Sequence, residues 1–354
     1  MIWLALLLAQ EPAAVRDLHD FLAERVAQAG MPAVAALVTN GERTLAAGVA
    51  GVRARGSEEA ATLDDRWHIG SCTKSMTATV AAMMVEEGKL SWEATPASVF
   101  AERAERMDPA WQGATLARLL TNTAGAVGDL GGVHPKLWER FWKEGLAPTA
   151  QRSLLVETLT ALPPERAPGS TFLYSNAGFS IAGAMMEQAA GVAYEDLMRA
   201  RLFEPLGMTS AGFGAPEGEG APWGHGANGK SVRPGRGADN PDAIAPAGRV
   251  HLTLEDWAKY ARRHLRIAQD EGPLRRLHEP AAESARARYA CGWIAAEIGD
   301  PPVQILGHSG SNTLWYSVIW LVPELDLAIL TACNDGAQGA AMERLTGDLL
   351  AEFR

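Results

Sequence analysis

The stretch RWHIGSCTKSMTATVAAMMVEEGKL, residues 66–90, places a serine and a lysine three positions apart at the start of an apolar run. From Met76 onward, apolar residues recur at roughly helical spacing, and Gly88 is typical of a helix end. The pattern predicts a helix with Ser71 at its N-terminus. Lys74 should then lie one turn later on the same face.

The Ser71–Lys74 pair has two interpretations. A Ser-x-x-Lys pair arises about once by chance in a chain of this size, so a helix cap beside a solvated lysine would need no function. Alternatively, the serine is a nucleophile whose proton the lysine takes, which requires that burial or nearby positive charge lower the lysine pKa. The helix N-terminus supplies partial positive charge. The choice depends on partners elsewhere in the chain.

Composition limits the classes of function. The 354 residues are 47% hydrophobic, enough for one large domain or two interlocked ones. A net charge of −10 argues against a nucleic-acid partner, because such proteins usually carry basic faces. The histidines are not grouped with carboxylates at ligand spacing, so we expect no metal. The three cysteines are expected to be buried as small hydrophobic residues: Cys72, Cys291 and Cys333.

The N-terminal run MIWLALLLA, residues 1–9, resembles the apolar part of a secretory signal. It predicts a periplasmic or secreted protein. The run is short and lacks a preceding Lys or Arg, so a cytoplasmic protein with an apolar terminus is the alternative. No other run is long enough to span a bilayer, and we expect no membrane span.

The two ends of the chain mirror each other. A helix is expected from Pro12 to Gly30, followed by two strands within residues 33–49 that are joined at Asn40-Gly41. Near the other end, residues 313–322 and 327–333 read as strands. A last helix runs through Phe353.

The middle of the chain is helical and rich in loops. Besides the Ser71 helix, helices are expected at residues 115–120, 153–159, 179–190 and 194–203. Residues 212–248 are crowded with Gly and Pro, and we expect them to wall or cover a pocket, with a flexible spacer as the alternative.

These patterns predict an α+β fold, in which an antiparallel sheet is flanked by N- and C-terminal helices and carries an inserted helical region. Residues 10–70 and 245–354 would form the sheet domain, and residues 71–244 the helical domain with the active-site loops. A cleft between the two would be the natural site.

Two further stretches carry polar groups. In YSN, residues 174–176, Tyr174 offers a proton shuttle and Asn176 an amide for a substrate carbonyl. A helix cap beside a packed aromatic is the alternative. In HSGS, residues 308–311, the His308 imidazole and a hydroxyl could bind a carboxylate, while Gly310 lets a substrate backbone approach.

The three stretches together resemble the serine β-lactamase and penicillin-binding protein superfamily, whose motif set is S-x-x-K with an S-D-N-like and a K-T-G-like element. With a Tyr-x-Asn middle element, the chain most resembles the class C β-lactamase and DD-peptidase group. The resemblance covers most of the chain, and its stretches occur in the family's order: WHIGSCTK, LLTNTAG, PGSTFLYSNAGF, LFEPLGMTSAGF, PAGRVHLTLEDWAKY and LGHSGSN.

The resemblance implies acyl transfer in two steps without a cofactor. Ser71 would attack a carbonyl carbon, with Lys74 and Tyr174 sharing the general-base work. Backbone N–H groups of Ser71 and Ser311 would form the oxyanion hole. Water would then release the acyl group. The further residues implied are His308 among the catalytic groups and, as substrate-binding residues, Asn122, Asn176, Ser309, Gly310 and Asn312.

Two departures from the family bear on the substrate. His308 stands where class C β-lactamases have lysine, which weakens the fixed positive charge because neutral imidazole prevails at pH 7. Ser309 keeps the hydroxyl that family carboxylesterases often replace with glycine, and this favours a substrate with a carboxylate. Asn122 stands where the family commonly has histidine.

The sequence therefore predicts a serine hydrolase acting on a β-lactam, a D-amino-acid peptide or a small ester, with a small molecule or short peptide as its partner. One alternative is a penicillin-binding or sensor-type protein that acylates without efficient turnover. Another is a G-x-S-x-G nucleophile elbow at Ser309, which would need a helix after the serine. The oligomeric state is left open.

Overall fold

The computed structural model describes residues 14–143, 145–218, 220–269, 272–283 and 288–354. The predicted signal segment, residues 1–9, lies outside this part of the chain. None of the helices described is both long and apolar enough to cross a membrane.

Among the described residues, nine strands form one sheet in the order β1-β3-β2-β14-β13-β12-β11-β10-β9. Neighbouring strands are antiparallel, except that β1 runs parallel to β3. The predicted α+β fold with an antiparallel sheet is confirmed, with one short parallel strand added at the edge. The strands are β1 (Arg16–Asp17), β2 (Ala33–Thr39), β3 (Thr44–Gly51), β9 (Ala282–Glu283), β10 (Arg288–Tyr289), β11 (Ile294–Ile298), β12 (Val303–Ser311), β13 (Tyr316–Val322) and β14 (Leu327–Cys333).

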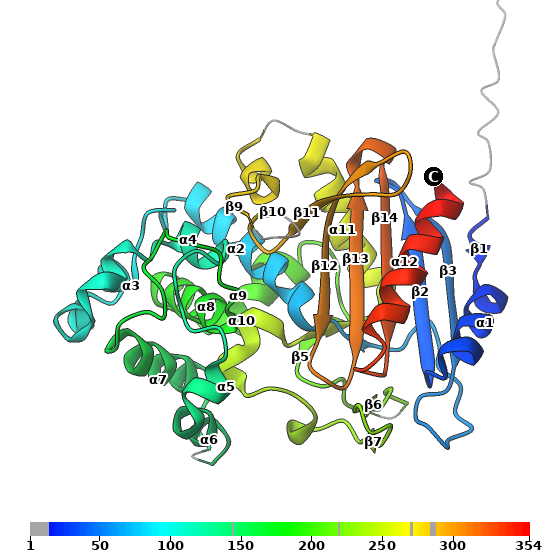
Figure 1. The fold of residues 1–354 in the computed structure, drawn as a ribbon, viewed down its shortest axis with the longest axis horizontal. Helices are drawn as coiled ribbons and strands as arrows, with labels where there is room; N and C mark the ends of the chain where they lie inside the picture. The colour runs from blue at the N-terminus through cyan, green and yellow to red at the C-terminus, as the bar shows by residue number, and fades with distance from the viewer. Residues whose placement is uncertain (1–13, 144, 219, 270–271, 284–287) are drawn as a thin grey trace, which may run out of the picture.

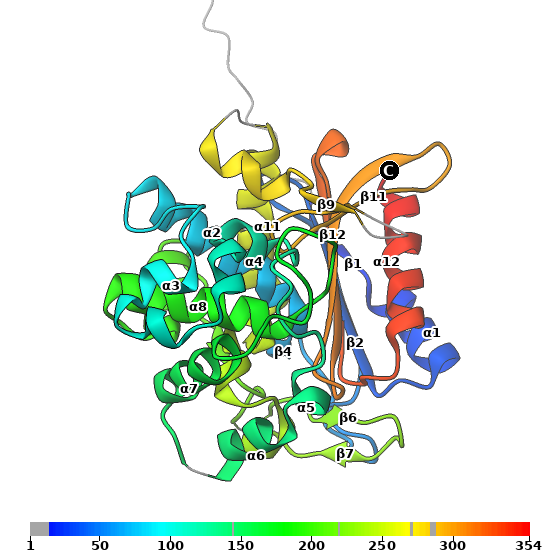
Figure 2. The ribbon, with the colours of Figure 1, turned by 60° about the vertical axis from the view of Figure 1, so that its left-hand side comes forward.

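Helices cover both faces of this sheet. The helices described are α1 (His19–Ala29), α2 (Thr73–Glu86), α3 (Pro96–Val99), α4 (Leu116–Leu120), α5 (Leu130–Val133), α6 (Pro135–Lys143), α7 (Pro148–Thr160), α8 (Asn176–Ala190), α9 (Tyr194–Met198), α10 (Ala245–Gly248), α11 (Leu254–Gln269) and α12 (Gly339–Phe353). The terminal helices α1 and α12 lie on one face, and the helical region lies on the other (Figures 1 and 2). The predicted arrangement of terminal helices and inserted helical region is confirmed.

The alternation of side chains along each strand builds two cores. Val34 and Val318 point into an apolar cluster shared with α1 and α12. Leu37 and Ile319 point the other way, into the larger cluster that includes Met76 of α2. Since successive residues of a strand face opposite sides, each strand residue can be assigned to one of the two layers.

Two element boundaries differ from the sequence prediction. The helix was predicted from Pro12, which lies outside the described residues; residues 14–18 are not helical and α1 begins at His19, because Arg16 and Asp17 pair with β3 instead. The Asp17 carboxylate then accepts the His19 N–H at 2.8 Å, which satisfies a donor at the new helix start. The strand predicted from residue 313 begins at Tyr316, because the residues before it form a turn.

The segment of residues 212–248 contacts both parts of the molecule: His225 bonds to Leu314 and Asn334 at the end of the large sheet, whereas its last residues pack against α2 and α8. Its described part contributes the short strands β5 (Gly212–Phe213), β6 (Gly224–His225) and β7 (Ser231–Val232), and it ends in α10. β5 joins β8 (Val250–Leu252) and β4 (Trp67–His68) in a second, three-stranded sheet. Because β4 immediately precedes Ser71, this small sheet links the segment to the candidate site.

Candidate active site

Ser71 lies in a tight turn at the start of α2. Residues Gly70–Cys72 form one turn of 3-10 helix that leads directly into the α-helix. Gly70 has φ +49°, a left-handed conformation that glycine adopts at little cost. One turn further along, Lys74 brings its Nζ to 2.9 Å from Ser71 Oγ. The proximity expected from the Ser-x-x-Lys spacing is present.

The Lys74 side chain is fully buried among neutral oxygen atoms. Its Nζ donates to Ser71 Oγ, to Asn176 Oδ1 at 2.7 Å and to the Ala247 carbonyl at 2.7 Å. Burial lowers the pKa of Lys74 well below its ordinary value, because the charged form loses its hydration. This shifts the amine toward the neutral form, which is the form that can accept the Ser71 proton.

Tyr174 lies beside this pair, two residues before α8. Its ring centroid is 4.7 Å from Lys74 Nζ. The residue is 36% exposed as a whole, but desolvation around its hydroxyl raises the pKa of Tyr174 above its ordinary value, and a hydrogen bond with the Ser71 hydroxyl offsets this only in part. The phenol therefore stays protonated and is suited to donate a proton. The neighbouring Ser175 caps α8 by accepting the Gly178 N–H at 2.9 Å.

His308 brings the third motif to the same place. The residue is 5% exposed, and its ring centroid lies 6.2 Å from that of Tyr174. Its Nδ1 is 2.5 Å from the Ser309 carbonyl, which can only accept, so Nδ1 carries the proton and Nε2 faces the Tyr289 hydroxyl at 3.3 Å. Burial, together with the nearby Lys74, lowers the pKa of His308 to about 3. The imidazole is neutral at physiological pH.

Two glycines allow the Ser71 turn to touch the end of β12. A Cβ atom on Gly70 would lie 2.3 Å from the Ser311 nitrogen, and one on Gly310 would lie 2.7 Å from the Ser71 nitrogen. Neither distance is tolerated by a real side chain, so both positions require glycine. This backbone contact brings together the two peptide N–H groups expected to form the oxyanion hole.

Two of the predicted substrate-binding asparagines, Asn176 and Asn122, already make hydrogen bonds within the protein. Asn176 Oδ1 accepts from Lys74 Nζ, so it orients the proposed base. Asn122 has φ +58°, its Oδ1 accepts the Ser175 N–H at 3.0 Å, and a side-chain hydrogen bond also links it to Tyr289. The Asn122 amide therefore holds the turn that carries Tyr174.

The Asn312 side chain has no polar capacity left for a substrate. Its Nδ2 donates to the Ala238 carbonyl and to Asp239 Oδ1, each at 3.1 Å. Its Oδ1 accepts the N–H groups of Leu314 and Trp315. A direct contact with substrate, as predicted from the sequence, would first require one of these bonds to break.

Ser309 faces the opposite layer from His308. It shares its strand face with Ile305, which packs in the α1/α12 cluster, and its hydroxyl lies within hydrogen-bonding reach of Tyr316 and Glu343. Burial raises the pKa of Glu343 above its ordinary value. The Ser309 hydroxyl thus stands beside an acid, which weakens the sequence argument that it favours a substrate carboxylate.

The structure also excludes two other nucleophiles. Ser309 lies within β12, and the chain turns into β13 rather than a helix, so the nucleophile-elbow alternative is wrong. Cys72 is buried and unpaired, and burial raises its pKa to about 12, which leaves the thiol protonated. Cys291 and Cys333 are likewise buried, as expected.

Sequence reasoning missed two contributors to the site. Ala247 offers only its backbone carbonyl to Lys74, and no side-chain motif marks such a group. Tyr289 is 3% exposed and contacts His308, but it stands alone in β10 without a motif around it. Within the described ranges, no group of three or more His, Cys, Asp or Glu side chains is arranged to hold a metal ion.

Comparisons with known proteins report a matching family and a matching fold. Residues 18–352 match the family described as Beta-lactamase. Penicillin-binding protein 4 of Amycolatopsis lactamdurans is 26% identical over 325 residues, covering 86% of this chain and 81% of its own. The lovastatin esterase of Penicillium rubens is 29% identical over 187 residues, which cover 49% of this chain and 44% of the esterase. A solved class C β-lactamase superposes with a TM-score of 0.75 at 19% identity, covering 92% of each chain, and shares the fold.

Proposed function

The chain belongs to the β-lactamase family, a family of hydrolases, and from this premise we propose that it is a serine hydrolase that forms an acyl-enzyme on Ser71. The observation that carries the proposal is the position of Lys74 Nζ, 2.9 Å from Ser71 Oγ and buried among neutral oxygens. A lysine in that environment is a base, because burial disfavours its charged form.

In the acylation step, protons move between Ser71, Lys74 and Tyr174. Neutral Lys74 takes the Ser71 proton as Oγ forms a bond to the substrate carbonyl carbon. The negative charge that develops on the carbonyl oxygen is held by the N–H groups of Ser71 and Ser311. As the bond to the leaving group breaks, the Tyr174 hydroxyl donates its proton to that group, and the protonated Lys74 returns a proton to the phenol.

Deacylation uses the same groups with water as the nucleophile. Lys74, neutral again, accepts a proton from water through the Tyr174 hydroxyl while the water oxygen attacks the acyl carbon. Collapse of the tetrahedral adduct breaks the bond to Ser71 Oγ, which regains a proton from Lys74. Asn176 keeps the amine in place throughout, since its Oδ1 accepts from Nζ at 2.7 Å.

The surroundings of the third motif support an ester or amide substrate that needs no bound carboxylate. His308 is neutral, because burial lowers its pKa to about 3. Ser309, on the other face of the strand, stands beside Glu343. The imidazole that faces the site is thus neutral, and the Ser309 hydroxyl is turned away from it, so the third motif offers no fixed positive charge to a substrate carboxylate. Small neutral esters are therefore favoured over penicillins.

A turnover panel tests the proposed function. We expect wild-type protein to hydrolyse p-nitrophenyl acetate with many turnovers and benzylpenicillin far more slowly, and Ser71→Ala to lose both activities. A single stoichiometric burst with every substrate would instead favour the penicillin-binding or sensor alternative. Equal ester turnover by Ser71→Ala would remove Ser71 from the mechanism.

A further inference from the structure

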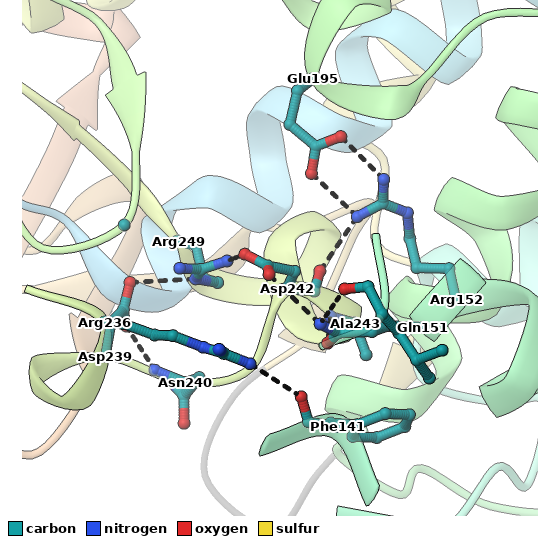
Figure 3. A network of polar contacts seen from close by, with 12 residues as sticks. Phe141, Gln151, Arg152, Glu195, Arg236, Asp239, Asn240, Asp242, Ala243 and Arg249 are labelled. Carbon is teal, nitrogen blue, oxygen red and sulfur yellow. Dashed lines mark hydrogen bonds and ion pairs between the residues drawn. The ribbon is translucent and has the colours of Figure 1, made fainter. Parts of the chain in front are cut away.

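A buried carboxylate, Asp239, lies behind the candidate oxyanion hole and receives four hydrogen bonds. Its Oδ2 accepts from His68 Nε2 at 3.0 Å and from Arg249 Nε at 3.1 Å. Its Oδ1 accepts from Asn312 Nδ2 at 3.1 Å and from the Asn240 N–H at 2.8 Å. Figure 3 shows Asp239 between Arg249 and Asn240.

The first connection leads from Asp239 to the Ser71 turn. His68 Nδ1 lies 3.1 Å from the Gly70 nitrogen, which can only donate, so Nδ1 accepts and carries no proton. The ring proton is therefore on Nε2, where it is donated to Asp239. The carboxylate thus selects the one tautomer of His68 that can hold the Gly70 N–H. His68 also stacks on Trp315, with ring centroids 5.9 Å apart.

The second connection leads from Asp239 to the end of β12. Asn312 follows Ser311 directly, and its side chain closes the turn by accepting the N–H groups of Leu314 and Trp315. Its Nδ2 is anchored on Asp239. The position of the Ser311 N–H is therefore tied to the same carboxylate that positions the peptide preceding Ser71.

We propose that Asp239 is a positioning residue for the oxyanion hole, acting through His68 on the Ser71 arm and through Asn312 on the Ser311 arm. The hole works only if both N–H groups point at one oxygen atom, so a shared anchor fixes their separation and angle before substrate binds. This inference rests on the proposed function, because it assigns a role within the acylation of Ser71.

The anchor is itself held rigidly. Arg249 donates to Asp239 and also to Asp242, and Figure 3 shows this chain of contacts continuing to Arg152 of α7. Burial alone would raise the pKa of Asp239, but the hydrogen bonds from His68 and Asn312 and the charge of Arg249 lower it. Asp239 is therefore a carboxylate that accepts all four bonds.

The test uses two substitutions of His68, each of which is designed to keep one of its two hydrogen bonds and remove the other. In His68→Asn the side-chain oxygen takes the place of Nδ1 and can still accept from Gly70. In His68→Gln the longer amide reaches toward Asp239 but leaves the Gly70 N–H without its acceptor. We expect His68→Gln to lower kcat for p-nitrophenyl acetate by about tenfold or more with KM little changed, and His68→Asn to recover part of that loss.

Inhibition by phenylboronic acid separates this role from a structural one. Its tetrahedral adduct on serine places an oxygen in the oxyanion hole, so its affinity should fall in parallel with kcat in His68→Gln. Asn312→Ser, on the other arm, should act in the same direction and serves if His68→Gln does not fold. His278→Gln is the matched control, since His278 is also buried but contacts His264 instead of the site.

Wild-type kcat and boronate affinity in folded His68→Gln and Asn312→Ser would overturn the proposal, as would losses no larger than those of His278→Gln. These outcomes are distinct from failure of the proposed function, in which wild-type protein itself would neither turn over the ester nor form a Ser71 adduct.

Discussion

Two fully buried basic side chains, Lys74 and Arg152, lie in opposite electrostatic surroundings. Arg152 donates to the carboxylates of Glu187 and Glu195 at 2.6 and 2.7 Å, and these partners raise its pKa despite its burial. Lys74 has three neutral oxygen partners, and burial lowers its pKa. Figure 3 shows the paired arrangement of Arg152 with Glu195.

The difference separates a structural cation from a catalytic base. Paired carboxylates stabilise the charge of Arg152, which therefore ties α7 to α8 and α9 as a permanent cation. Neutral dipoles compensate the charge of Lys74 less well than carboxylates do, and so they leave its amine able to release and accept a proton. The partners of a buried cation, rather than its burial, decide which role it has.

The largest effect is expected from removing the base. Lys74→Met keeps the length and burial of the side chain but has no proton acceptor, so the acylation rate should fall by about 10³-fold or more. Stopped-flow release of p-nitrophenol measures this rate, and circular dichroism checks the fold. Acylation within tenfold of wild type would show that another group activates Ser71.

Removing the structural cation should affect stability instead. Arg152→Met leaves the Glu187 and Glu195 carboxylates without their partner, and we expect the free energy of unfolding to fall by about 3 kcal/mol. Urea unfolding measures this change. Adding Glu187→Gln and Glu195→Gln should restore most of it, whereas an unchanged unfolding midpoint in Arg152→Met would contradict the comparison.

Giving Lys74 a carboxylate partner should make it resemble Arg152. In Asn176→Asp the new acid contacts Nζ and raises the Lys74 pKa, so less of the amine is neutral at pH 7. We expect acylation at pH 7 to fall by about tenfold and the rate–pH profile to move to higher pH. Asn176→Ala, which adds no charge, should show no such alkaline shift; identical profiles for the two variants would refute the electrostatic account.

The smallest effect concerns His308, a buried base without a charge. Its folded-state pKa of about 3 lies below the ordinary value of 6.5, so the unfolded chain binds the extra proton as pH falls below 6.5. Stability should therefore decrease with falling pH by about 1.4 kcal/mol per pH unit from this group. His308→Gln should reduce the slope of unfolding free energy between pH 6 and pH 4 by that amount. An unchanged slope would show that His308 is protonated in the folded protein.

The sequence predicted the parts of the site that a local pattern defines. Ser71 and Lys74 face each other because three residues of helix make one turn, and Ser175 caps α8 within its own stretch. The sheet and its flanking helices also followed from periodicity. The prediction for residues 14–18, just before α1, was wrong, because pairing with β3 competes with the helical pattern there.

The groups that adjust this site come from distant parts of the chain and carry no motif. The Ala247 carbonyl is 173 residues from Lys74, and Asp239 is 171 residues from His68. Only the packing of α10 and β4 brings these groups together. Ser309 is the opposite case: its motif predicted a place in the site. The alternation of side chains along β12 instead turns its hydroxyl toward Glu343.

The most direct test of the central claim is the intact mass of the protein after incubation with a fluorophosphonate and, separately, with benzylpenicillin. We expect wild-type protein to gain a single fluorophosphonate adduct that Ser71→Ala lacks, and Lys74→Met to form it far more slowly. The penicillin arm reports whether β-lactams fit the same site. An adduct that persists in Ser71→Ala, or none on folded wild-type protein, would contradict the assignment of Ser71 and Lys74 as nucleophile and base.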